Sequence, residues 1–135
     1  MSFVLDNSVL CGWFLANQAD NYTEAIASRL AESQAWAPPL LQLEWINVLR
    51  TGCRRGRITL AEAREIIDLV AALPIRIDTT LPSPPALLAL SLRHNLSSYD
   101  AAYLDLALRL QLPIATRDHD LIEAAWAAGV GVMKA

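Results

Sequence analysis

The chain has 135 residues, of which 54% are hydrophobic, and a formal net charge of −3 at pH 7. This length favours one domain that buries roughly two-thirds of its unfolded surface. No basic segment opens the chain and no apolar run approaches the roughly 20 residues of a membrane span, so we expect a cytoplasmic protein with no secretory signal and no membrane contact. The solitary Cys11 and Cys53 and the scarcity of histidine argue against a disulfide framework and a zinc site.

Short apolar runs alternate with longer segments of helical periodicity. The run before Asp6 predicts a buried strand, Pro39 suits the first turn of a helix, and Thr59 with Glu62 predicts a capping box. The expected strands span residues 2–5, 36–37, 75–78, 113–116 and 131–133, and the expected helices span 8–15, 21–33, 39–53, 59–73, 84–94, 98–111 and 118–128. This alternation predicts an α/β domain covering residues 1–135, with a mainly parallel sheet and helices on its faces.

Two aspartates follow predicted strands. Asp6 comes directly after the first strand, and Asp118 comes two residues after the strand at 113–116. In an open parallel sheet the carboxyl ends of the strands share the edge where ligands bind, so we expect both side chains at that edge. Each residue also has a local alternative, because Asp6 could form an Asx-turn before Ser8 and Asp118 could cap the helix that follows it.

Two further acids lie in helical segments. Glu44 stands in the apolar stretch 40–49, where an ionised carboxylate is costly unless a cation or several donors meet it. The alternative is an exposed glutamate on a narrow polar stripe with Asn47. Asp100 follows Ser97 at a predicted helix start, where capping explains an acid equally well. Together, the four carboxylates match the hard oxygen ligands that Mg²⁺ or Mn²⁺ prefers.

Arginine carries nearly all of the positive charge, and four arginines are bunched near the end of a predicted helix: Arg50, Arg54, Arg55 and Arg57. Guanidinium groups suit phosphates, although cations at a helix C-terminus also stabilise the helix dipole. Setting the four candidate acids aside leaves the rest of the chain slightly positive. The net charge therefore does not exclude a nucleic-acid partner.

Several segments resemble PIN domains. The resemblance rests on residues 3–8 with Asp6, on 39–49 with Glu44, on the Ser-Tyr-Asp-Ala-Ala-Tyr-Leu stretch at 98–104, on 113–118 with Asp118, and on 129–132. These segments cover essentially the whole chain in the family's order. The chain looks most like the VapC-type toxins of bacterial and archaeal toxin–antitoxin pairs, which implies a three-layer α/β/α sandwich.

This resemblance implies a Mg²⁺- or Mn²⁺-dependent endoribonuclease, usually a homodimer, that is held inactive by a small VapB-like antitoxin. It also implies that Asp6, Glu44, Asp100 and Asp118 are both the metal ligands and the catalytic residues. By the same resemblance, Ser8 and Thr116 match positions that support those acids through hydrogen bonds, whereas Asp120 is interpreted as a surface residue.

Other α/β functions fit these residues to different degrees. A receiver domain would need an acidic pair after its first strand, and a haloacid-dehalogenase-like phosphatase would need an acid at position 8; Asn7 and Ser8 stand there instead. A PIN-like module that binds RNA or a partner protein without cutting it is the serious alternative. DNA is a further candidate substrate, because recognition of the ribose 2′-OH depends on local contacts.

Overall fold

A four-stranded parallel sheet forms the centre of the computed structural model, which describes residues 1–135. The strands are β1 (Phe3–Leu5), β2 (Ala35–Ala37), β3 (Ile75–Ile77) and β4 (Ile114–Ala115), in the spatial order β3-β2-β1-β4. The strand order therefore reverses at β1, which pairs with β2 on one side and with β4 on the other. In open α/β sheets, ligands bind at such a reversal, beyond the carboxyl ends of the strands.

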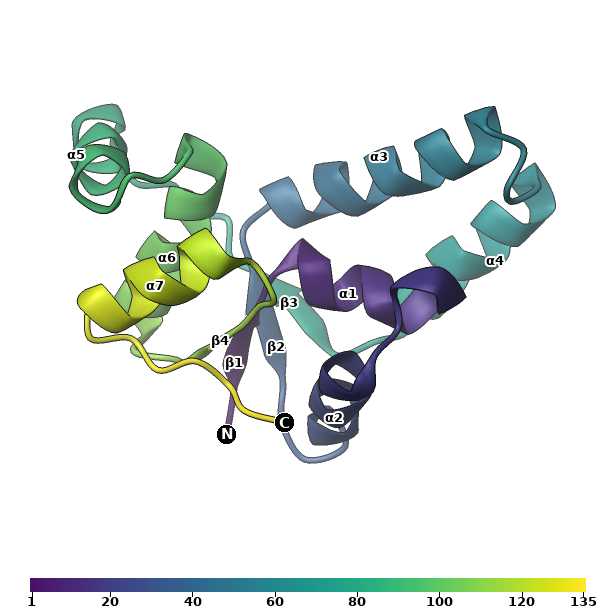
Figure 1. Ribbon diagram of the computed structural model, residues 1–135, viewed down its shortest axis with the longest axis horizontal. Coiled ribbons are helices and arrows are strands. Elements are labelled where there is room, and N and C mark those ends of the chain that lie inside the picture. The colour runs from purple at the N-terminus through teal and green to yellow at the C-terminus, as the bar shows by residue number, and fades with distance from the viewer.

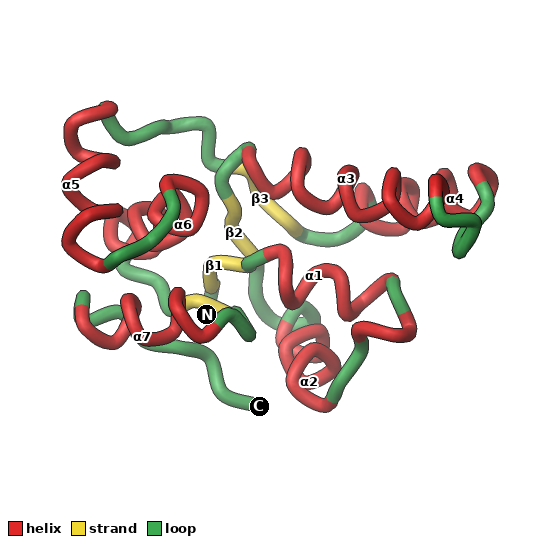
Figure 2. Tube along the Cα trace, turned by 45° about the horizontal axis from the view of Figure 1, so that its top comes forward, coloured by secondary structure: helices red, strands yellow, loops and turns green.

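Helices cover both faces of this sheet and make three layers (Figures 1 and 2). One layer contains α1 (Asn7–Phe14), α2 (Asn21–Arg29), α3 (Leu40–Arg54) and α4 (Leu60–Ala71), and the other contains α5 (Pro84–His94), α6 (Ser98–Leu110) and α7 (His119–Ala127). The hairpin of α3 and α4 projects away from the sheet (Figure 1). The expected α/β/α sandwich with a parallel sheet is confirmed.

The core lies on both sides of β1. All three residues of this strand are completely buried, because a parallel sheet between two helical layers has no solvent-facing side. Tyr103 of α6 is the largest fully buried side chain. Gly12 brings α1 close to α2, since a Cβ at this position would lie 2.4 Å from a methyl carbon of Thr23.

Three elements differ from the sequence-based expectations. The predicted strand at 131–133 is reduced to a single bridge between Ile114 and Val132. Successive residues of a strand direct their backbone groups to alternate sides, so the two residues of β4 offer only one of them, Ile114, to this segment. Helix α2 ends at Arg29, whose carbonyl accepts the hydroxyl hydrogen bond of Ser33. A short 3-10 helix, η1 (Ala16–Gln18), was not expected.

No helix of the protein combines the length and the apolar character that a membrane crossing would require.

Candidate active site

Asp6 and Asp118 lie at the carboxyl edge of the sheet, where β1 and β4 are neighbours. Leu5 pairs with Ala115, so the chain segments that follow the two strands leave the sheet side by side. Thr116 links the two acids directly: its hydroxyl donates to Asp6 Oδ2 at 2.7 Å and accepts from the backbone N–H of Asp118 at 3.0 Å. The expectation that both aspartates reach one edge is confirmed by this link.

The carboxylate of Asp6 is buried and held by two hydroxyl groups. Its Oδ2 accepts from Ser8 and from Thr116, each at 2.7 Å, and its side chain forms no capping hydrogen bond to α1. Burial raises the pKa of Asp6, and the two hydroxyl donors partly offset this rise. The predicted support of Asp6 by these two hydroxyls is confirmed.

The direction of both hydroxyl protons is set by the backbone. Ser8 Oγ accepts from the N–H of Arg117 at 3.0 Å, and Thr116 Oγ1 accepts from the N–H of Asp118. Since each oxygen already receives a proton donor on one side, its own proton is available for Asp6. The loop after β4 therefore orients Asp6 in one fixed position.

Glu44 projects from α3 and meets a buried tyrosine. Its side chain is half-buried, and Tyr103 Oη donates a short hydrogen bond of 2.5 Å to Glu44 Oε1. Burial raises the pKa of Glu44, and the charge of Asp6 acts in the same direction, whereas the tyrosine hydrogen bond lowers it. The glutamate therefore forms a half-buried polar pair with Tyr103, whereas Asn47, one turn further along α3, is exposed.

Asp100 lies in the first turn of α6, where its backbone N–H donates to Ser97 Oγ at 3.1 Å. The expected capping arrangement is therefore present, but it uses only the backbone of Asp100. Burial, followed by the negative charges of Asp118, Asp6 and Glu44, raises the pKa of Asp100 to about 6. The side chain of Asp100 thus interacts electrostatically with all three of the other candidate acids.

Asp118 is the N-cap of α7, as the alternative interpretation of this residue proposed. Its Oδ1 accepts from the N–H of Asp120 at 3.0 Å, and its second carboxylate oxygen is not used in the cap. Capping and a further role are thus compatible for Asp118. Asp120 is exposed, in agreement with its interpretation as a surface residue.

Two residues around the acids carried no clear signal in the sequence. Tyr103 lies three residues after Asp100, so helical spacing places it on the same side of α6, but nothing local indicates its contact with Glu44. Arg117 donates to the carbonyl of Ser8 through Nε and Nη2 and reaches Gln18 O and Asp20 Oδ2 through Nη1. This one side chain thereby ties the β4 loop to α1, η1 and the start of α2.

The donor set matches a hard divalent cation by its chemistry, because all four side chains offer carboxylate oxygens. Burial is the main reason why the pKa values of Asp100 and Glu44 are raised, and the charges of neighbouring acids, which a bound cation relieves, add to this rise. However, no group of three or more His, Cys, Asp or Glu side chains is arranged as a finished metal cage.

Both cysteines are free thiols, and Cys53 is only half-buried, whereas Cys11 is buried.

Comparison with known proteins places this geometry in context. The family model of the PIN domain matches residues 3–127. Ribonuclease VapC1 of Mycobacterium tuberculosis, in strains CDC 1551 / Oshkosh and ATCC 25618 / H37Rv, is 39% identical over 97 residues, which cover 70% of this chain and 71% of that protein. The crystal structure of PAE2754 from Pyrobaculum aerophilum superposes with a TM-score of 0.70 at 18% identity, covering 92% of this chain and 84% of that one. This last similarity concerns the fold alone.

Proposed function

Because the chain belongs to the PIN-domain family and is of the VapC type, we propose that it is an endoribonuclease that hydrolyses RNA phosphodiester bonds. Asp6, Glu44, Asp100 and Asp118 form its active site. The observation that carries this proposal is the meeting of the acids beyond β1 and β4, where Thr116 joins Asp6 to Asp118 by hydrogen bonds. Burial and then the charges of the other three acids raise the pKa of Asp100 in agreement with this arrangement. Perturbed acids gathered at the carboxyl edge of a parallel sheet are typical of functional sites.

The cofactor of this reaction is Mg²⁺ or Mn²⁺, held by oxygens of the same four carboxylates. When bound, such an ion lowers the pKa of a coordinated water and stabilises the charge that develops on the phosphate. The hydroxyls of Ser8 and Thr116 keep Asp6 in one orientation, and Tyr103 does the same for Glu44. These hydrogen bonds are accepted by one oxygen of each carboxylate, Asp6 Oδ2 and Glu44 Oε1.

Proton transfer is the second task of the site. Hydrolysis adds water across the P–O bond, so one proton leaves the attacking water and one reaches the departing oxygen. Without a cation, burial and then the neighbouring carboxylates raise the pKa of Asp100 to about 6; a bound cation would keep Asp100 ionised, in the form that accepts a hydrogen bond and does not donate one. Its place in the first turn of α6, fixed by Ser97, presents this carboxylate from the layer opposite Glu44.

Cleavage of total cellular RNA tests this function. Wild-type protein should cut at a few discrete sites with Mg²⁺ or Mn²⁺ and should not cut with EDTA, whereas Asp6→Asn and Asp100→Asn should not cut at all. Asp68→Asn is the matched control, because Asp68 is exposed on α4 away from the sheet edge. Cleavage by Asp6→Asn at the wild-type rate refutes the assignment of the acids. If the wild-type protein neither cleaves RNA nor binds metal in calorimetry, the alternative of a binding module that does not cut RNA replaces the enzyme.

The proposal extends to the partners of this protein. We propose that it is a cytoplasmic toxin, neutralised by a small VapB-like antitoxin, and that it forms a homodimer. Exposed leucines support a dimer, since Leu88 and Leu92 lie one turn apart on α5 and are 60% and 74% exposed. Light scattering of the purified protein distinguishes a dimer from a monomer.

A further inference from the structure

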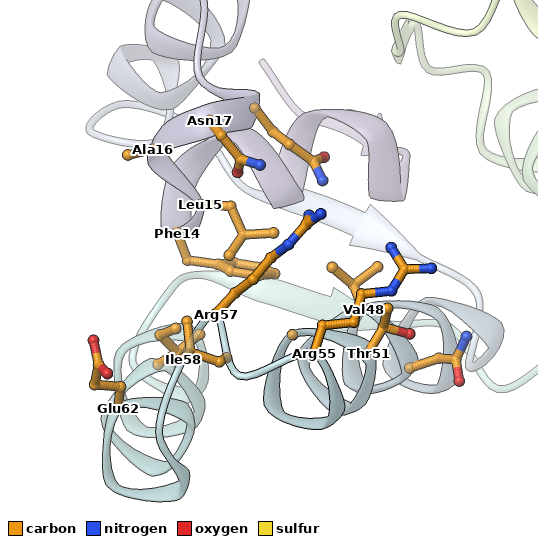
Figure 3. A pocket seen from close by; sticks show the side chains of 14 residues that line it. Phe14, Leu15, Ala16, Asn17, Val48, Thr51, Arg55, Arg57, Ile58 and Glu62 are labelled. Carbon is orange, nitrogen blue, oxygen red and sulfur yellow. The ribbon is translucent and has the colours of Figure 1, made fainter.

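A hollow of about 520 Å³ lies apart from the four acids, between the end of α1, η1, the second half of α3 and the start of α4. Its polar lining consists mainly of Asn17, Gln18, Asn47, Thr51, Arg55 and Arg57. Figure 3 shows that the guanidinium groups of Arg55 and Arg57 extend into this space from the turn between α3 and α4. We call this cavity the arginine hollow.

The lining of the arginine hollow carries a net positive charge, from two arginines and one glutamate. The three ion pairs of the protein are made by Arg109 and Arg117, so neither Arg55 nor Arg57 has an acidic partner. Glu62 is the one acid in the lining, and its Oε1 already accepts from the N–H of Thr59 in the capping box of α4. Two free guanidinium groups beside amide and hydroxyl side chains favour an anion with several acceptor oxygens.

Helix α3 connects this hollow to the acids. Glu44, Asn47, Thr51 and Arg55 follow one another at spacings of three and four residues, so they form one stripe along the helix. At about 1.5 Å per residue, Arg55 lies roughly 16 Å from Glu44 along the helix axis. A strand of a few nucleotides with its reacting phosphate at the acids can cover this distance.

We propose that the arginine hollow is a phosphate-binding subsite, in which Arg55 and Arg57 hold the backbone of the RNA strand at a distance from the bond that is cut. This inference rests on the proposed ribonuclease function and deepens it. The apolar residues of the lining, Phe14 and Ile58 among them, offer a surface to a base or to a protein side chain alike. The two guanidinium groups favour an anionic partner, and an RNA backbone that follows α3 from the acids brings repeated anionic oxygens to them.

Two double variants with equal loss of charge test this subsite. Arg55→Gln/Arg57→Gln removes the cations of the hollow, and Arg50→Gln/Arg54→Gln removes the two neighbouring arginines, which are exposed and do not line it. Both are made in the wild type and in the non-cutting Asp100→Asn background. The probe is a fluorescein-labelled single-stranded RNA of mixed sequence, about twenty nucleotides long, in Mg²⁺ buffer across a range of salt concentrations. Thermal melting verifies that each variant is folded.

In the Asp100→Asn background, Arg55→Gln/Arg57→Gln (the hollow variant) should raise the Kd for the labelled RNA roughly tenfold. The slope of log Kd against log salt should become less steep by about 1.4, which is about 0.7 for each of the two lost phosphate contacts. The control variant should change Kd less than about twofold. With an active site, the hollow variant should raise KM by a similar factor and leave kcat within about twofold of wild type, since the lost contacts bind substrate without touching the reacting atoms.

The outcomes separate the subsite from the function. If wild type cleaves RNA and the two double variants bind and cleave alike, the subsite is wrong and the ribonuclease function stands. If wild type neither binds nor cleaves RNA while the metal binds, the ribonuclease function fails and takes the subsite with it. If the hollow variant keeps its RNA affinity and salt dependence but loses affinity for an inhibitory protein, the hollow is a protein-docking surface and the proposal is overturned.

Discussion

Asp100→Asn should stabilise the metal-free protein at neutral pH. Burial and three neighbouring carboxylates raise the pKa of Asp100 from 3.8 to about 6, so the folded protein holds this proton more tightly than the unfolded chain does. The stability contributed by the protonated side chain is therefore complete below about pH 4 and is lost as the pH rises through about 6. Above that pH, wild type carries an ionised carboxylate that the fold disfavours, and the amide of asparagine avoids this cost.

The size of this effect follows from the pKa shift. A rise of about 2 pKa units corresponds to about 3 kcal/mol at 1.36 kcal/mol per unit. Asp100 is only half-buried, and solvent screening reduces the figure to about 1.5 kcal/mol. For a chain of this size, such a change in the free energy of unfolding raises Tm by roughly 5 °C.

Urea unfolding in EDTA, measured from pH 4 to pH 8, tests this reasoning. The free energy of unfolding of Asp100→Asn should exceed that of wild type by about 1.5 kcal/mol at pH 7.5, and the difference should vanish towards pH 4. Asp68→Asn, an exposed control on α4, should show no such pH-dependent gain. Equal stability of Asp100→Asn and wild type at pH 7.5, or a difference that does not change with pH, would show that burial and the neighbouring carboxylates do not raise the pKa of Asp100 in the folded protein.

Two further substitutions test the residues around the acids. Tyr103→Phe removes the hydroxyl that donates to Glu44 Oε1, so the pKa of Glu44 should rise further. The fold should be retained and kcat/KM for RNA cleavage should fall about tenfold. Unchanged cleavage kinetics would show that the tyrosine contributes to packing alone. Arg117→Lys keeps the charge but loses the forked hydrogen bonds to Ser8 O and the reach to Gln18 O, and urea unfolding should show a loss of about 1–3 kcal/mol. Arg64→Lys, exposed on α4, is the control, and equal losses in both variants would contradict a specific tie.

The sequence by itself determined the elements and the edge at which the aspartates meet. The apolar run before Asp6 and the capping box at Thr59 act over a few residues, so periodicity and spacing were sufficient to predict β1 and α4. Parallel strands share a carboxyl edge, and this rule predicted the proximity of Asp6 and Asp118 without knowledge of the strand order. The catalytic roles of the four acids and the metal they bind stay predictions that the experiments above decide.

Only the tertiary structure decided which side chains complete that edge. Tyr103 and Glu44 are 59 residues apart in the chain, and Arg117 and Ser8 are 109 apart, so no local pattern links them. These contacts exist because β4 pairs beside β1, and because α3, which packs on α1, and α6, which packs on β1, bring Glu44 and Tyr103 together. Local rules describe a residue and its chain neighbours, whereas a hydrogen bond between distant segments depends on how the whole chain packs. That packing places Tyr103 against Glu44 and makes Arg117 the tie between three separate segments.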